Sequence, residues 1–412
     1  MKKRILAMVV AMLFLITGCS TKIQGEDLMR DVQQDEKPVV QMSEVNSVAL
    51  TDFAVRLFQS SVEESKNTLI SPLSVLSALA MTANGAKEET LSQMEAVFGM
   101  TTDELNEFLH SYIKALPQGE KYKLNLANSI WFTEDERFTV KEGFLQTNAD
   151  YYGANVYKTP FDNTTVKDIN NWVKEKTDGM IPKIVDQISP NEVMYLINTL
   201  AFDAEWASTY KGSQIRDGIF TKEDGQKQDV EFMCADENVY LEDENATGFV
   251  KYYKDYKYAF VALLPNEGVS VAEYVSGLNG ENLNRLLTNS LNATVKTSIP
   301  KFESEYLTEM SEVLSKMGMA DAFDGDKADF TGLGTSTKGN IYINRVLHKT
   351  YISVAEKGTK AGAATVVAMG EKTAFVEEEP KIVCLDRPFV YMLIDCESNV
   401  PFFVGTMMNL DK

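Results

Sequence analysis

The sequence is poor in the groups that most enzymes use for catalysis. Its 412 residues include only two histidines, His110 and His348, and it contains no G-x-S-x-G, no H-E-x-x-H and no complete phosphate-binding loop. Cations are also scarce, because 40 Lys and Arg against 60 Asp and Glu give a formal charge of -20. Nucleic acids and anionic membrane surfaces are both bound mainly through Lys and Arg side chains. These absences argue against an enzyme and against a nucleic-acid partner.

The N-terminus has the pattern of a processing segment. Met1–Arg4 is basic, and Ile5–Ile16 is an apolar run too short to span a bilayer comfortably. The run leads into Thr17-Gly18-Cys19, which resembles the lipobox of bacterial lipoproteins. The resemblance implies a signal peptide over residues 1–18 and acylation of Cys19, which would anchor the protein to a membrane or cell surface outside the cytoplasm. An ordinary secretion signal and a short uncleaved anchor are alternatives.

The other cysteines do not form a recognisable framework. Cys234, Cys384 and Cys396 have no metal-ligand spacing, and an odd number excludes a full set of disulfides. A single disulfide between two of them is possible, and buried free thiols are the interpretation that we favour. The acidic run Asp324–Asp329 lacks the ligand order of a calcium loop and reads as a solvated turn. We therefore expect no metal and no cofactor.

Two regions follow the signal segment. Residues 19–44 are acidic and polar with little apolar periodicity, and we interpret them as a tether, with a docking motif as the alternative. From Val45 apolar residues recur near helical spacing, and no composition shift, linker or repeat divides residues 45–412. A single mixed α and β domain is the simplest interpretation. The pattern predicts helices over Ser74–Ala83, Glu88–Phe98, Thr102–Leu116, Lys141–Tyr152 and Val166–Lys176, and strands over Tyr122–Phe132, Glu192–Phe202, Tyr258–Leu264, Ala293–Ile299, Asn340–Ala355 and Phe389–Ile394.

One stretch near the C-terminus suits two conformations. Glu356–Thr365 contains five Ala or Gly residues and two threonines in ten positions, a composition typical of a flexible loop. If it were extended, alternate residues would face one side, and these are small enough to enter a packed core: Thr359, Ala361, Ala363 and Thr365. The segment is therefore a candidate conformational switch.

The stretch resembles the hinge of the reactive-centre loop of inhibitory serpins, with Glu356, Gly358, Thr359, Ala361, Ala363, Ala364 and Thr365 as hinge residues. The resemblance extends in order from about Val45 to the end. It rests on Asn67–Ser74, Ala78–Met81, Asn84–Ala86, Leu126–Phe132, Ile169–Val173, Asn198, Phe202, Trp206, Leu263–Pro265, Ile299–Phe302, Ala328–Phe330 and Asp386–Tyr391. It implies an α+β fold of three β-sheets with eight or nine surrounding helices and an exposed loop.

The resemblance also assigns residues to two structural sites. Ser71, Ser74, Asn198 and His348 would form the shutter, a buried polar cluster beneath the central strands of the main sheet. Trp206 and Lys301 would belong to the breach, where that sheet opens, with Lys301 facing Glu356. On composition alone, His348 and Trp206 are more simply core residues, and the two interpretations are compatible.

The implied function is inhibition of a serine protease by a suicide-substrate mechanism, with a monomeric inhibitor. The resemblance implies a scissile bond after the seventeenth residue counted from Glu356 inclusive, which is Lys372–Thr373, and a lysine there suits a trypsin-like target. Because the stretch that follows is long, Met369 and Phe375 are alternative bait residues. Lys360 and Ala355 depart from the pattern of the family. A non-inhibitory serpin-fold binding protein and a solute-binding lipoprotein are the competing functions.

Overall fold

The computed structural model describes residues 23–41, 43–116, 122–135, 138–189, 192–254, 256–337, 339–359 and 379–411. Several residues that the sequence analysis singles out lie outside this part of the chain: Cys19, Ala361, Ala363, Ala364, Thr365, Lys372 and Thr373. Among the described residues, no helix combines the length and the apolar character needed to cross a membrane.

Nine α-helices form in the described part of the chain, and their ends follow local signals. In α4, for example, the Thr101 side chain accepts from the Glu104 backbone N–H while the Glu104 carboxylate accepts from that of Thr101, which is a capping box. The helices are α1 Glu44–Ser61, α2 Pro72–Ala83, α3 Glu88–Phe98, α4 Thr102–Lys114, α5 Glu142–Tyr152, α6 Asn163–Lys176, α7 Val271–Gly277, α8 Gly280–Thr288 and α9 Ser311–Leu314, with short helical turns η1 Gly212–Gln214, η2 Ser315–Met319 and η3 Ala320–Phe323.

The described strands form three sheets. A seven-stranded sheet has the order β1-β5-β3-β6-β15-β14-β12, a nine-stranded sheet the order β16-β11-β8-β9-β10-β17-β18-β2 with β7 paired to β8, and β13 pairs with β4. The strands are β1 Glu26–Asp27, β2 Thr68–Ile70, β3 Tyr122–Thr133, β4 Phe138–Val140, β5 Asn155–Thr159, β6 Met194–Glu205, β7 Ile215–Thr221, β8 Lys227–Glu242, β9 Ala246–Tyr252, β10 Tyr258–Pro265, β11 Leu291–Pro300, β12 Phe302–Glu309, β13 Gly334–Ser336, β14 Arg345–Ala355, β15 Gly358–Thr359, β16 Lys381–Cys384, β17 Phe389–Asp395 and β18 Pro401–Met407.

The expected α+β class, with three sheets and eight or nine helices, is confirmed in the described residues. One predicted strand, Asn340–Ala355, begins late: β14 starts at Arg345. The side chain of Asn344 instead accepts from the backbone N–H groups of Val193 and Met194, at 2.7 and 3.1 Å, which ties this stretch to the start of β6.

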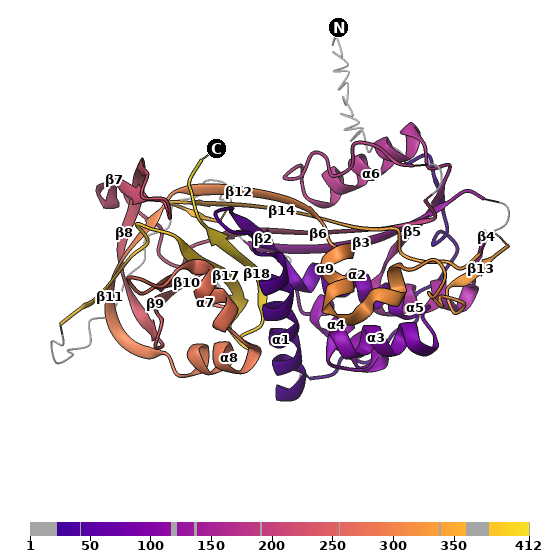
Figure 1. Cartoon of the computed structure of the whole chain (residues 1–412), viewed down its shortest axis with the longest axis horizontal. Helices are drawn as coiled ribbons and strands as arrows, with labels where there is room; N and C mark the ends of the chain where they lie inside the picture. The colour runs from indigo at the N-terminus through magenta and orange to yellow at the C-terminus, as the bar shows by residue number, and fades with distance from the viewer. Residues whose placement is uncertain are drawn as a thin grey trace, which may run out of the picture.

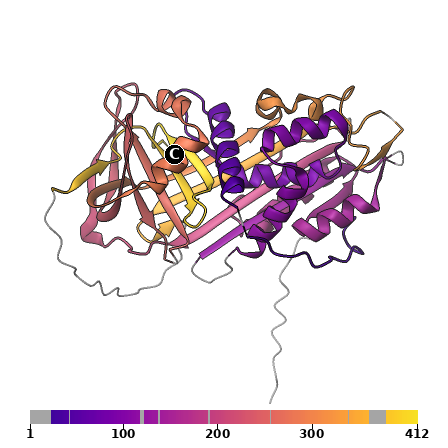
Figure 2. The same cartoon turned by 90° about the horizontal axis from the view of Figure 1, so that it is seen from below.

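Helices lie against both faces of the seven-stranded sheet, with α6 over one end of one face and α2 on the other face (Figure 1), while alternate positions of β12 stay exposed. Alternation along β3 shows this: Trp131 packs in a core beneath α6 with Trp172, while Ile130 and Phe132 face the larger core that includes residues of α2. The nine-stranded sheet lies at the other end of the molecule beside α7 and α8 (Figures 1 and 2).

The N-terminal segment does not behave as a free tether over residues 23–41. Asp168 of α6 accepts from the backbone N–H groups of Gln24 and Gly25, at 2.8 and 3.0 Å. The next residues form β1, which pairs antiparallel with β5 at the edge of the sheet. The tether interpretation is therefore corrected for this segment, which is hydrogen-bonded to the domain.

The same segment continues across α4 and α5. The backbone N–H of Asp35 donates to Asp150 at 2.8 Å, and Lys37 forms an ion pair with the same carboxylate at 3.0 Å. Further along, the backbone N–H of Val40 donates to the Ser111 hydroxyl at 2.9 Å. The polar composition of the segment thus reflects hydrogen bonds to the domain, not solvation alone.

Gly85 supplies a test of the packing between α2 and the loop before β13. An added Cβ would lie 2.4 Å from the Leu333 Cβ and 2.8 Å from its Cα. Because backbone cannot yield cheaply, we expect Gly85→Ala to lower the free energy of unfolding by about 1–3 kcal/mol, measured by urea titration. Gly143→Ala is the matched control, since a Cβ there meets nothing within 4 Å. Equal effects of the two variants would contradict the close approach at Gly85.

Candidate functional site

The hinge begins inside the seven-stranded sheet. After β14 the chain turns at Glu356 and Lys357, and β15 then pairs antiparallel with both neighbours. Gly358 lies opposite Ala355 and Glu205, and Thr359 lies opposite Val354 and Ala204. Lower in the sheet, β6 and β14 pair directly from Tyr195↔Arg345 to Asn198↔His348. The two strands are therefore joined below and separated above, where the first two hinge residues occupy the gap.

The turn before β15 is fixed by backbone hydrogen bonds. The indole Nε1 of Trp206 donates to the Ala355 carbonyl at 2.9 Å, and the backbone N–H of Trp206 donates to the Lys357 carbonyl at 2.9 Å. The backbone N–H of Tyr210 donates to the Glu356 carbonyl, also at 2.9 Å. Trp206 thus lies where the resemblance places the breach tryptophan, and it holds the hinge turn from two sides.

An ion pair borders this turn. Lys301 Nζ contacts the Glu356 carboxylate and lies 3.0 Å from that of Glu231. The hydrogen bond from Lys301 lowers the pKa of Glu356, and the two carboxylates raise the pKa of Lys301. Both side chains of the Lys301–Glu356 pair are partly exposed, so the pair contributes about 0–1 kcal/mol to stability. Its main effect is to orient the turn.

Two neighbours of the hinge were missed by the sequence analysis. Tyr253 stacks on Trp206 with ring centroids 4.5 Å apart, and its hydroxyl lies 2.5 Å from the Thr359 hydroxyl. Lys251 Nζ lies 5.4 Å from the Trp206 ring centroid and 2.6 Å from the Glu237 carboxylate. Both residues stand in an ordinary strand-like run, and only the folded contact distinguishes them.

The four predicted shutter residues lie together and are fully buried. The backbone N–H of Ser71 donates to His348 Nε2 at 3.0 Å, so the ring proton resides on Nδ1, which donates to Asn198 Oδ1 at 2.7 Å. The Ser74 hydroxyl donates to the same oxygen at 2.9 Å. This arrangement joins α2 to β6 and β14 at the point where the two strands still pair.

The polar cluster extends one strand further than the sequence analysis expects. Asn128 of β3 lies directly opposite Asn198, and its amide donates to the Ser77 hydroxyl at 2.7 Å. Asn198 Nδ2 and Asn128 Oδ1 are buried without a hydrogen-bond partner. An unpaired donor and an unpaired acceptor on facing residues are suited to a bridging water. Asn128 stands in the Leu126–Phe132 motif, but only the register of β3 against β6 brings it opposite Asn198.

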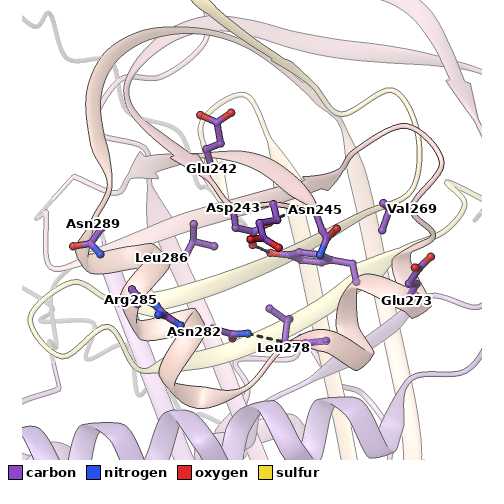
Figure 3. Close-up of a pocket in the computed structure, with 13 residues that line it drawn as sticks. Glu242, Asp243, Asn245, Val269, Glu273, Leu278, Asn282, Arg285, Leu286 and Asn289 are labelled. Carbon is purple, nitrogen blue, oxygen red and sulfur yellow. Dashed lines mark hydrogen bonds between the residues drawn. The ribbon is translucent and has the colours of Figure 1, made fainter.

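Other features of the described residues lie away from the hinge. A cavity of about 550 Å³ lies between the β8–β9 turn and α7 and α8, where Tyr274 donates to Asp243 at 2.8 Å (Figure 3). No group of three or more His, Cys, Asp or Glu side chains is placed to hold a metal ion in the described part of the chain.

The three described cysteines form no disulfide, and each is partly exposed, whereas the sequence analysis expects buried thiols. Cys234 and Cys384 stand on the strands at either side of β11, each opposite Ser298. Their sulfur atoms lie 3.5 and 3.7 Å from its hydroxyl. Because a whole strand separates them, they cannot form a disulfide in this arrangement.

The shutter histidine predicts a pH dependence of stability. Burial lowers the pKa of His348 to about 3, well below its usual value. The unfolded chain therefore takes up a proton below about pH 6.5 that the folded chain refuses, and stability is lost as the pH falls from there toward 3. Between pH 7 and pH 5, this should cost about 2 kcal/mol of the free energy of unfolding.

Urea titration of the wild type and of His348→Gln at both pH values measures this contribution. The variant should lose about 2 kcal/mol less than the wild type over the same interval. His110→Gln removes the other histidine and shows whether the difference belongs to His348. An equal loss in the wild type and in His348→Gln would contradict the assignment.

Comparison with known proteins matches this geometry. The family model described as "Serpin (serine protease inhibitor)" matches residues 48–410. An uncharacterized serpin-like protein of Thermococcus kodakarensis is 30% identical and covers 93% of this chain and 88% of its own length. Serpin B8 of Homo sapiens is also 30% identical, over 86% of this chain and 96% of its own length.

Solved structures of serpins have the same fold as this chain. The thermophilic serpin tengpin in its native state is 48% identical, covers 94% of this chain and all of its own, and superposes with a TM-score of 0.90. Its latent state gives a TM-score of 0.81 at 49% identity, covering 91% of this chain. The present arrangement is therefore more similar to the native state. With the family model matched over most of its length, the chain belongs to the serpin family of serine protease inhibitors.

Proposed function

We propose that the protein inhibits a serine protease as a suicide substrate, through insertion of its hinge into the seven-stranded sheet. The observation that carries the proposal is the gap between β6 and β14, which β15 has already entered. In the described residues, β6 and β14 pair directly at Tyr195–Asn198 with Arg345–His348, so a strand that entered between them above this point would find backbone donors and acceptors on both sides.

The reaction begins as ordinary proteolysis. The protease serine oxygen attacks the carbonyl carbon of the bait residue, the peptide bond to the next residue breaks, and the new amine leaves with a proton. An ester then joins the protease to the hinge. The freed hinge continues into the sheet from Thr359 and draws the protease with it, which distorts the protease active site before water can cleave the ester.

Insertion supplies the driving force. About 15 residues that gain ladder hydrogen bonds at roughly 0.5–1.5 kcal/mol each contribute on the order of 10 kcal/mol. At about 3.3 Å per residue, the new strand would be roughly 50 Å long, enough to cross the molecule. Small side chains at the inward hinge positions, Thr359, Ala361, Ala363 and Thr365, let the strand enter without displacing the core.

We propose a trypsin-like protease as the target, with Lys372 as the bait. The support is the position of Lys372 in the sequence relative to Glu356, together with the preference of such proteases for a basic residue. Met369 and Phe375 remain the alternatives for elastase-like and chymotrypsin-like enzymes.

The proposed location is outside the cytoplasm, on a bacterial membrane to which lipid on Cys19 anchors a monomeric inhibitor. The basic start, the short apolar run and the small residues that lead into Cys19 support this location. Multiple acyl chains give durable attachment where a single chain is marginal.

Mixing the soluble chain from Ser20 onward with trypsin tests the mechanism. This chain keeps the segment 23–41 that binds the domain. A band at the summed mass should survive boiling in denaturing gels, and the released peptide should begin at Thr373 when its mass is determined. Thr359→Arg should instead be cleaved without trapping, because position 359 is already buried between β6 and β14 and a charged side chain could not occupy it, so the hinge would lose its place in the sheet.

Undiminished covalent trapping by Thr359→Arg would refute hinge insertion. Clean cleavage of the wild type by trypsin, elastase and subtilisin alike would indicate a protein of this fold that does not inhibit. A complex with a peptide that begins elsewhere would move the bait residue and leave the trapping mechanism intact.

Lipid attachment is tested on the full chain expressed in a bacterium. Mass spectrometry should find a mature N-terminal peptide that begins at Cys19 and carries acyl groups, and the protein should partition into the membrane fraction. Cys19→Ala should abolish both, whereas Cys396→Ala should change neither. A mature chain that begins at another residue, without lipid, would sink the anchor proposal.

A further inference from the structure

The hydroxyl of Tyr253 contacts the first residue of the hinge whose side chain enters the core. Tyr253 Oη and Thr359 Oγ1 lie 2.5 Å apart, and both side chains are buried, at 0% and 1% exposed. A hydrogen bond between two buried hydroxyls is costly to break, because each hydroxyl would then be buried without a partner and without access to water.

The Tyr253 side chain itself has little freedom. One face of its ring stacks on Trp206 with planes 14° apart, and Phe202 approaches edge-on at 4.9 Å. Trp206 is in turn fixed by its bonds to the Ala355 and Lys357 carbonyls. The hydroxyl is therefore held at one point above the opening of the sheet, and Thr359 is the hinge residue that meets it.

The position of this contact matters for the order of insertion. Within the described residues, which end at Thr359 here, β15 pairs with β6 and β14 at Gly358 and Thr359, and the two long strands pair with each other at Asn198 and His348. The residues that follow Thr359 must enter between these points. When Thr359 is held in the sheet, the first two residues of the new strand are already hydrogen-bonded to β6 and β14. Each later residue can then extend that set of hydrogen bonds. Ordering the first residues of a hydrogen-bonded segment costs the most conformational entropy, and adding further residues costs less.

We propose that Tyr253 is a positioning residue for loop insertion: its hydroxyl keeps Thr359 seated in the sheet, so that insertion extends a strand already begun and outruns release of the protease. This inference rests on the proposed inhibitory function. Tyr253 makes no contact with the protease in this scheme, and it acts through the hinge.

The measurable quantity is the partition ratio, the amount of cleaved free inhibitor divided by the amount of covalent complex. Tyr253→Phe removes one hydroxyl and Thr359→Val removes the other with little change of shape. Each should raise the partition ratio about two- to ten-fold, the range expected for one lost hydrogen bond. The rate constant for association with trypsin should stay within about two-fold of the wild type, because the bait residue is untouched.

The double variant separates a specific bond from general damage. With both hydroxyls removed, no buried group is left unpaired, so the double variant should have a partition ratio no higher than that of either single variant. Additive effects of the two substitutions would overturn the proposal.

Tyr274→Phe is the matched control. Tyr274 is also buried and its hydroxyl also makes a hydrogen bond, to Asp243 at 2.8 Å, but it lines the cavity of Figure 3 and not the hinge. This variant should keep the wild-type partition ratio. A rise equal to that of Tyr253→Phe would attribute the effect to lost stability and overturn the proposal.

Hydrogen exchange provides a readout that needs no protease. The backbone amides of Gly358 and Thr359 should exchange faster in Tyr253→Phe and in Thr359→Val than in the wild type or in Tyr274→Phe. If the wild type trapped no protease, the inhibitory function would fail, and faster exchange would still support the seating of Thr359 by Tyr253. Unchanged exchange together with an unchanged partition ratio would refute it.

Discussion

The structure depends on how the inner edges of β6 and β14 satisfy their backbone groups. The two strands pair with each other only as far as Asn198 and His348, and above that point they part to admit β15. A strand that enters between β6 and β14 can pair with both of them, so the place where they part is where further backbone hydrogen bonds can form. Two residues fill part of it, and the sequence that follows them has the small side chains needed to fill the rest.

The shutter and the hinge anchor act at opposite ends of this gap. At the lower end, a neutral His348 joins Ser71 to Asn198, and burial keeps it neutral by lowering its pKa. At the upper end, Trp206 binds the hinge turn through two carbonyls. The hydrogen bonds of His348 and Ser74 to Asn198 Oδ1 hold β6, β14 and the start of α2 together, and they would be lost if the strands separated. The sheet is therefore held closed by local polar contacts in the resting state. The larger gain in free energy would come from the backbone hydrogen bonds that an inserted strand forms with β6 and β14.

Much of the fold could be predicted from the sequence, because its signals are local. The cap that starts α4 lies within four residues, and β10 is an unbroken apolar run. The N-terminal segment could not be predicted, since Gln24 and Asp35 bind carboxylates 144 and 115 positions away. At the site, the resemblance placed the shutter residues, Trp206 and the Lys301–Glu356 pair. It did not indicate Tyr253, whose role arises only when a strand from elsewhere in the chain brings Thr359 beside it.

The two edges of the seven-stranded sheet bear on how such a molecule stays soluble. A sheet with room for another strand is also a template on which neighbouring molecules could aggregate. One edge is β1, two acidic residues that cover part of β5, and the other is β12, whose exposed positions include Glu303 and Glu305. Glu305 is paired with Lys349, but the β1 carboxylates and Glu303 place negative charge at both borders, which opposes a second copy that approaches edge to edge. Because these charges stand at the edges, they leave the centre of the sheet, between β6 and β14, as the place where a strand can be added.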